Sequence, residues 1–272
     1  MLSLISLRFD ITSPVTKEIG FSGIPLRAAF LDILKNYDRK LSSDTHQGQG
    51  VRMYALGIMS HDRHFSTTLR QGIEDSFDIT LLNHQNYRDF TKHLILKDDL
   101  YIRLYENILP VRRIGVSIME PQEIMHTWVD APELQKAERI RIALTFRTPT
   151  QLAHSDSNAL CLFPMPEKVF PALMKIWQSI DRTTYFFPLG EYREWVKRNI
   201  EIPRYTIRTY PLKTGSGMQI VGFIGTVYYT IKDGSIPMSR MTAGLARFAE
   251  YSNIGKHRTA GLGMISTDIE LM

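Results

Sequence analysis

The sequence predicts an α+β protein built from two consecutive units, each with the element order β-α-β-β-α-β. Segments with an apolar side chain at every second position begin near residues 5 and 139, which is typical of half-buried strands. Each is followed by apolar residues at helical spacing, then by further strands and a second helix. This element order is that of the ferredoxin-like fold, and 272 residues are enough for two such domains.

The first unit is predicted over residues 1–130. Apolar side chains at 5, 7, 9 and 11 alternate with polar ones, which predicts a strand. Ser22-Gly23-Ile24-Pro25 is typical of a helix start, because proline is tolerated in the first turn. The other elements expected here are a polar loop at 38–52, strands at 53–59, 77–82 and 111–118, and a helix at 86–96.

The second unit is predicted over residues 137–272, after a polar, proline-marked boundary at 129–133. Its first strand alternates apolar residues with Arg139, Arg141 and Arg147. We expect helices at 167–180, 191–199 and 238–251, and strands at 204–211, 218–231 and 261–270. No residue-level repeat relates the halves, so the two-unit organisation depends on element order.

The positive charge is unevenly distributed between the two halves. Residues 1–136 contain 16 Lys and Arg against 17 Asp and Glu, whereas residues 137–272 contain 17 against 11. A basic half can bind a polyanion through counterion release, or be an ordinary basic surface. Charge alone leaves both interpretations open.

The composition also bears on compartment and cofactors. The single cysteine, Cys161, excludes an internal disulfide and suits a reducing cytoplasm. The sequence contains no secretory signal pattern and no apolar run near 18 residues, so we expect a cytoplasmic protein with no membrane partner. His61-Asp62-Arg63-His64 lacks the ligand spacing of a metal site and is predicted to be an exposed inter-strand loop. We expect neither a metal nor a cofactor, and we expect Cys161 to be buried.

A glycine-rich segment at residues 252–265 separates the last helix from the last strand. Gly255 is placed to end the helix in the left-handed conformation. Gly261 and Gly263 allow the close approach of a phosphate or of another backbone. Three basic residues in the same loop favour phosphate contact over a purely structural cap: Lys256, His257 and Arg258.

This loop carries a family resemblance. Phe-Ala-Glu-Tyr-Ser-Asn-Ile-Gly255, a basic stretch and then Ala-Gly-Leu-Gly-Met-Ile265 resemble the C-terminal signature of the CRISPR repeat-processing endoribonucleases of the RAMP superfamily. Residues 144–150 and 221–226 resemble strands of that family's second domain. The resemblance covers the whole chain and implies tandem ferredoxin-like (RRM-like) domains, CRISPR repeat RNA as partner and, in some relatives, a CRISPR effector complex.

The family's activity is metal-independent cleavage of RNA by its own 2′-hydroxyl, which leaves a 2′,3′-cyclic phosphate and a 5′-hydroxyl. A base must take the 2′-hydroxyl proton, an acid must protonate the leaving oxygen, and cations must stabilise the phosphorane. Histidine titrates near neutrality and suits the proton transfers. The resemblance implies His46 and Arg52 as the catalytic residues, with His46 in a loop that contains Gly48 and Gly50. A solvated loop histidine is the alternative.

Relatives place a third catalytic residue, a tyrosine, in the first helix. The matching position is near Leu31, which has no acid–base chemistry. Tyr37 lies one and a half turns later, but its spacing also fits the apolar stripe of the helix. The identity of the third residue therefore stays open.

The remaining candidates concern RNA binding. Plausible phosphate contacts, each of which can also be a plain surface arginine, are Arg139, Arg141, Arg204 and Arg208. Residues 221–229 are faintly similar to an RNA-recognition strand, although buried packing explains them as well. The leading hypothesis is an endoribonuclease, favoured by His46 and Arg52. The alternatives are a non-catalytic RNA-binding subunit of a CRISPR effector complex and, more distantly, a ferredoxin-like metabolic enzyme or regulator.

Overall fold

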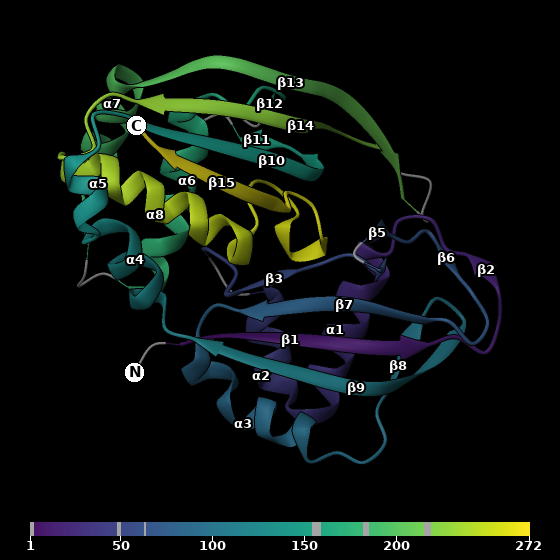
Figure 1. Cartoon of the computed structure of the whole chain (residues 1–272). Helices are drawn as coiled ribbons and strands as arrows, with labels where there is room; N and C mark the ends of the chain where they lie inside the picture. The colour runs from purple at the N-terminus through teal and green to yellow at the C-terminus, as the bar shows by residue number, and fades with distance from the viewer. Residues whose placement is uncertain (1–2, 48–49, 63, 154–158, 182–184, 215–218) are drawn as a thin grey trace. The chain divides into compact units, whose positions relative to one another are not determined.

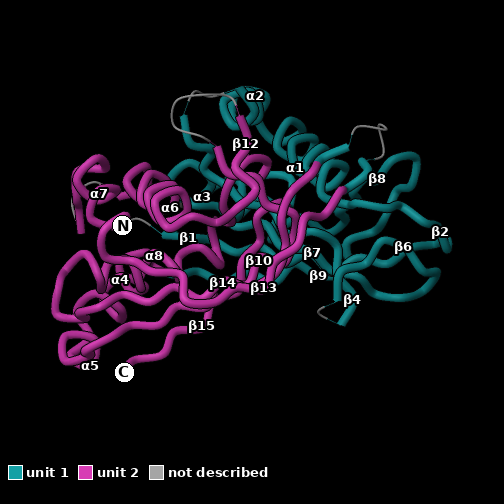
Figure 2. The backbone as a smooth tube through the Cα atoms, turned by 90° about the horizontal axis from the view of Figure 1, so that it is seen from above, with its two compact units in different colours: residues 1–119, 212–220, 259–261 teal, residues 120–211, 221–258, 262–272 magenta. Residues whose placement is uncertain are grey.

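The computed structural model describes residues 3–47, 50–62, 64–153, 159–181, 185–214 and 219–272 (Figure 1). The chain divides into two compact units (Figure 2). Unit 1 comprises Met1–Met119, Leu212–Ile220 and Thr259–Gly261, and unit 2 comprises Glu120–Pro211, Val221–Arg258 and Leu262–Met272. Unit 2 thus begins ahead of the boundary expected at residues 129–133, because helix α4 (Pro121–Val129) packs on helix α8 (Pro237–Ser252) of the same unit.

Unit 1 contains an antiparallel sheet with β1 (Leu4–Thr12) at its centre. β1 pairs with β7 (Glu74–Leu81) on one side and with β9 (Asn107–Met119) on the other, and β3 (Tyr54–Leu56) pairs with β7. The order β9-β1-β7-β3 is the ferredoxin-like order predicted from the sequence. The same sheet also contains β4 (Ser60–His61), β5 (His64–Phe65) and β8 (Tyr101–Leu104), and β2 (Lys17–Glu18) pairs separately with β6 (Thr68–Leu69).

The alternation at residues 5–11 makes β1 the centre of the unit 1 core. The four apolar side chains of this alternation are at most 1% exposed, and Phe9 stacks on Phe77 of β7 with ring centroids 4.9 Å apart. Helix α1 (Gly23–Tyr37) adds Leu26, Phe30 and Leu34 to the same core. Helix α3 (His84–Ile95) begins at Asn83, whose side chain accepts a hydrogen bond from the Gln85 backbone N–H.

The polar loop expected at residues 38–52 is wrong, because residues 39–47 form helix α2 (Arg39–Gln47). The Asp38 carboxylate accepts hydrogen bonds from the backbone N–H groups of Lys40 and Leu41, at 2.7 and 3.0 Å. This is the capping contact that starts a helix. The sequence Asp38-Arg-Lys-Leu contains the capping residue, but the polar composition that follows it masks the helix.

Unit 2 repeats the fold with β10 (Ile140–Thr150), β13 (Ile200–Lys213), β14 (Gln219–Ile231) and β15 (Ile265–Leu271), in the order β13-β14-β10-β15. The helices are α4, α5 (Pro132–Lys136), α6 (Pro166–Ile180), α7 (Leu189–Asn199) and α8, and β11 (Leu152–Ala153) pairs with β12 (Leu160–Cys161). The prediction of two ferredoxin-like units is confirmed by strand order. None of the helices in the described ranges has the length and apolar composition needed to cross a bilayer.

The glycines of the segment 221–226 allow close packing within the unit 2 sheet. A Cβ added to Gly222 would overlap the backbone of Thr150 on β10. A Cβ added to Gly225 would overlap the backbone of Thr206 on β13, and Gly225 has a φ of 123°. β14 therefore needs glycine wherever a neighbouring backbone comes this near.

Candidate functional site

His46 lies in the last turn of α2, at the surface of unit 1. The two buried residues of α2 fix this helix: the Ser42 hydroxyl donates to the Leu31 carbonyl at 3.0 Å, and the Thr45 hydroxyl lies 3.1 Å from the Tyr87 hydroxyl. His46 follows Thr45 and is exposed. It is therefore a helical residue and not the loop residue that was expected, and Gly48 lies outside the described residues.

Arg52 lines a hollow of unit 1 with a cavity volume of about 440 Å³. The other lining residues are Leu41, Asp44, Thr45, Val51, Met53, Asn86 and Tyr87. Arg52 is half-buried, as is Val51 beside it. The structure thus brings Arg52 to a hollow whose wall includes Thr45, the neighbour of His46 in the sequence. The hollow thus contains one guanidinium and one carboxylate, those of Arg52 and Asp44, and His46 is not among its lining residues.

Tyr87 of α3 is a residue of this hollow that the sequence did not indicate. Burial raises the pKa of its phenol, and the hydrogen bond with Thr45 opposes part of that shift. The phenol is therefore a neutral hydroxyl near pH 7 and can donate a hydrogen bond. The spacing of Tyr87 in its helix predicts a core residue. Its polar contact with Thr45 cannot be inferred from the sequence, because the two residues are far apart in the chain.

Leu31 and Tyr37, the two positions considered for the third catalytic residue, make packing contacts instead. Leu31 is partly buried against the unit 1 core, and its carbonyl oxygen holds Ser42 of α2. The ring of Tyr37 packs against Phe90 and His93 of α3, with centroid separations of 5.6 and 4.9 Å. Tyr37 lines a separate hollow between α1, α3 and β8. Tyr37 is 36% exposed, so its ring packs at the edge of the core and not within it.

The histidine pair at positions 61 and 64 forms the β4–β5 hairpin, where the two residues face each other across the ladder. His61 lies 3.4 Å from the Asp62 carboxylate, and Arg63 lies outside the described residues. Within the described ranges, no three His, Cys, Asp or Glu side chains are grouped so as to hold a metal ion. Cys161 is buried, as predicted.

The C-terminal loop of residues 252–265 is closed mainly by its own backbone. Helix α8 ends at Ser252 with Asn253 as its C-cap residue, at a φ of 51°, and so it ends earlier than the Gly255 position expected from the sequence. Gly255 lies against the Gln151 carbonyl, which accepts the Lys256 N–H at 2.9 Å. Gly263 lies against Ile254, whose N–H donates to the Gly263 carbonyl at 2.9 Å.

Two further features of the loop differ from the prediction that it leads directly into the last strand. Residues 258–260 form a 3₁₀ turn, so β15 begins at Ile265 and not near residue 261 as predicted. Gly261 has a φ of 74°, and a Cβ there would overlap the Ile58 side chain of unit 1. The close approach inferred for Gly261 and Gly263 is thus made by protein atoms.

The three basic residues of this loop differ in exposure. His257 is exposed at a φ of 60°, and Lys256 is half-buried. Arg258 is only 7% exposed, and its guanidinium donates to the Ser252 carbonyl at 3.1 Å. The Arg258 carbonyl in turn accepts from the Asn253 side-chain amide at 3.1 Å. Arg258 therefore stabilises the loop, while the basic residues Lys256 and His257 reach solvent.

The four arginines expected on the unit 2 sheet all reach solvent. Arg139 is exposed just before β10, and Arg141 forms an ion pair with Glu270 of β15 at 3.0 Å. Arg204 and Arg208 are exposed on β13. The guanidinium carbon of Arg204 lies 5.3 Å from the Tyr228 ring centroid, and that of Arg208 lies 5.9 Å from the Tyr210 centroid.

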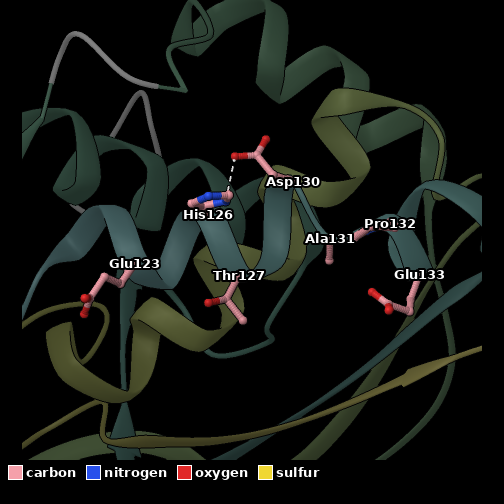
Figure 3. Close-up of a pocket in the computed structure, with 7 residues that line it drawn as sticks. All are labelled: Glu123, His126, Thr127, Asp130, Ala131, Pro132 and Glu133. Carbon is pink, nitrogen blue, oxygen red and sulfur yellow. Dashed lines mark ion pairs between the residues drawn. The ribbon is translucent and has the colours of Figure 1, made fainter.

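A hollow of about 640 Å³ on α4 and α5 was not expected from the sequence (Figure 3). Its wall includes Glu123, His126, Asp130 and Glu133. His126 Nδ1 lies 3.1 Å from the Asp130 carboxylate, which also accepts a short hydrogen bond from the Tyr185 hydroxyl. Partial burial and this acceptor raise the pKa of Tyr185 to about 12. Asp130 is thus already engaged, and the hollow is an acidic surface unsuited to RNA.

Comparisons with known proteins agree with the resemblance in the sequence. The family model described as CRISPR-associated endoribonuclease Cas6 matches residues 144–265, just under half of the chain. No curated protein matched the chain by sequence. This match confirms the resemblance of residues 144–265 to the CRISPR repeat-processing endoribonucleases.

Solved Cas6 structures share the fold over the whole chain. A Cas6 product complex superposes with a TM-score of 0.73 at 20% identity, covering 98% of this chain and 99% of that chain. Thermus thermophilus Cas6 superposes with a TM-score of 0.70 at 15% identity, covering 98% and 99%. A chain of a partial Cas6-RT-Cas1–Cas2 complex gives 0.67 at 15% identity, with 100% of this chain matching 47% of that one.

Proposed function

We propose that this chain, with its Cas6 family match at residues 144–265, is an endoribonuclease that cleaves CRISPR repeat RNA without a metal ion. Exposed His46, one residue after Thr45 in the wall of the Arg52 hollow, is the observation that carries the proposal. RNA supplies its own nucleophile, the 2′-hydroxyl, so the protein has to move protons and stabilise charge. Neither task requires a bound ion.

Each residue of the site has a defined part in the reaction. His46 takes the proton of the 2′-hydroxyl, whose oxygen then bonds to the adjacent phosphorus. The bond from phosphorus to the 5′-oxygen breaks as that oxygen takes a proton from a water molecule, so the products carry a 2′,3′-cyclic phosphate and a 5′-hydroxyl. Arg52 stabilises the negative charge that develops on the phosphorane. The neutral Tyr87 hydroxyl is buried beside Thr45 and holds α2 in place.

The RNA is held by basic residues of unit 2. The exposed and half-buried ones are Arg139, Arg141, Arg204, Arg208, Lys256 and His257. Gly255, Gly261 and Gly263, together with Arg258, fix the backbone that carries Lys256 and His257. The excess of Lys and Arg in residues 137–272 supports this division.

The test is incubation of the purified chain with labelled repeat RNA in EDTA. Site-specific cleavage with a cyclic phosphate end would establish both the activity and its independence of metal. A repeat with 2′-deoxyribose just 5′ of the cut should stay intact. Its cleavage would indicate an activated water in place of the 2′-hydroxyl.

The alternative is a non-catalytic RNA-binding subunit of a CRISPR complex. The match to a chain of a Cas6-RT-Cas1–Cas2 complex supports association with other CRISPR proteins. Tight binding of repeat RNA with no cleavage under any condition tested would favour this alternative. The exposed His46, which follows Thr45 of the Arg52 hollow in the sequence, favours the enzyme.

A further inference from the structure

The outward face of the unit 2 sheet combines aromatic rings with arginines. This face is opposite to the side chains that form the core, such as Leu144 of β10 and Val227 of β14, which are fully buried. Thr145 and Thr226 are next to these residues in the sequence and therefore point to the outward face. They pair across the ladder, with their hydroxyl oxygens 2.9 Å apart. Tyr228 follows two residues after Thr226 and therefore shares this face.

The segment 221–229 contains three aromatic side chains, and they differ in orientation. Phe223 and Tyr229 are buried, and each packs edge-on against another core ring. Tyr228 is half-buried on the outward face, and one side of its ring is covered by the exposed Arg204 guanidinium. Core packing explains the first two aromatics but not Tyr228.

A second pair of the same kind continues along β13. Arg208 lies four residues after Arg204, and its guanidinium lies over the Tyr210 ring, which is 39% exposed. Tyr205, on the opposite face of the same strand, instead packs edge-on against Phe163 with centroids 5.3 Å apart. The arginine–tyrosine pairs therefore occur on one face of the strand only.

This arrangement is suited to unpaired nucleotides. An arginine guanidinium within about 6 Å of an aromatic ring places a planar cation and a π-face next to each other, and a base can stack on either. The hydroxyls of Thr145 and Thr226 beside it can exchange hydrogen bonds with base edges or a ribose 2′-hydroxyl. Double-stranded RNA hides its bases, so stacked pairs of this kind favour a single strand.

We infer that Arg204–Tyr228 and Arg208–Tyr210 form a stacking platform for a single-stranded RNA segment. The inference rests on the proposed function and names the kind of RNA that this face binds. Arg204 and Arg208 then contact bases as well as phosphates. The platform gives affinity with little sequence preference, because stacking does not read the edges of the bases.

The experiment compares two labelled eight-residue oligonucleotides, oligo(A) and an abasic oligomer with the same number of phosphates. Tyr228→Ala should weaken oligo(A) binding about 5- to 150-fold, the range found when a base-stacking aromatic is removed. It should leave abasic binding and the slope of log affinity against log salt unchanged, because no phosphate contact is lost. Tyr228→Phe should bind like the wild type.

Matched variants separate stacking from folding and charge. Tyr205→Ala removes a tyrosine from the other face of β13 and should leave oligo(A) affinity unchanged. Arg204→Lys keeps the positive charge but removes the planar guanidinium. It should therefore weaken oligo(A) binding and leave abasic binding unchanged. Tyr228→Leu retains an apolar side chain and covers the case in which Tyr228→Ala unfolds.

Two outcomes would overturn the platform: equal loss for oligo(A) and the abasic oligomer in Tyr228→Ala, or no loss for either. Both are measured without cleavage. Failure of wild-type protein to cut repeat RNA would instead count against the proposed function alone.

Discussion

The Arg52 hollow and the C-terminal loop of residues 252–265 are both polar regions beside a helix end, yet they are built in opposite ways. In the hollow, the anchoring is done by neutral groups, Thr45 and Tyr87, and His46 is left exposed. In the loop, a charged residue does the anchoring, because Arg258 is buried against the Ser252 carbonyl.

This difference separates two uses of a cationic residue. An exposed histidine on a fixed helix can exchange protons with a ligand, whereas a buried arginine that already donates to a carbonyl has its charge committed to the protein. Glycines add to the contrast, since Gly255 and Gly263 of the loop lie against protein backbone and Gly261 lies against the Ile58 side chain. The hollow therefore suits chemistry, and the loop suits the rigid presentation of Lys256 and His257.

The largest expected effect is that of His46→Ala. Removing a general base should slow cleavage by roughly 10²–10⁴-fold, while repeat binding stays within a few fold because no phosphate contact is lost. Single-turnover cleavage at saturating enzyme measures the rate, and filter binding measures the affinity.

His64→Ala is the matched control, since His64 is also exposed in unit 1 but lies in the β4–β5 hairpin. It should cleave at the wild-type rate. Full activity of His46→Ala would remove His46 from the reaction and direct attention to His257, the exposed histidine of the loop.

Arg52→Ala should have the next largest effect. Loss of one donor to a developing anion costs a few kcal/mol, so the chemical step should slow by roughly 10–10³-fold. Arg52→Lys should recover part of this rate, because it restores the charge but not the planar donor fork. An unchanged single-turnover rate with weaker binding would make Arg52 a phosphate contact only.

Two separate substitutions in the C-terminal loop distinguish an RNA-binding residue from a structural one. Lys256→Ala should weaken RNA binding and reduce the salt slope by about 0.7, the value for one contact on a single strand. Arg258→Ala should leave that slope unchanged but lower the free energy of unfolding by about 1.5–3 kcal/mol, since it removes a buried hydrogen bond from a charged donor. Salt titrations and chemical denaturation measure the two effects. A reduced slope in Arg258→Ala with unchanged stability would return Arg258 to the RNA interface.

β1, β10 and α6 were predictable because each follows a strong apolar period. Residues 5–11 and 140–146 alternate strictly, and the helix expected at 167–180 appears as Pro166–Ile180. α2 was missed because it buries hydroxyls, Ser42 and Thr45, and not an apolar stripe. Polar burial leaves no periodic signal in the sequence.

The chemistry of individual residues was less predictable than the fold. His46 and Arg52 were named from the resemblance, but Tyr87 was not, since its contact to Thr45 spans 42 positions. The burial of Arg258 was equally hidden, because a basic residue among glycines looks the same whether it faces a phosphate or a carbonyl. The sequence shows that a residue is basic, but it does not show whether the side chain points to solvent or into the protein.

The smallest expected effect concerns the contact that fixes α2. Tyr87→Phe removes the partner of the Thr45 hydroxyl, which is buried, and should lower the free energy of unfolding by about 1–3 kcal/mol. Thr45→Val removes the hydroxyl on the other side, and the double variant should cost less than the sum of the singles, because neither group is then left unsatisfied. If the contact also holds His46 in position, the single-turnover rate should fall in all three variants while repeat affinity stays unchanged. Additive stability losses in the double variant would show that the two hydroxyls act independently and that another contact fixes α2.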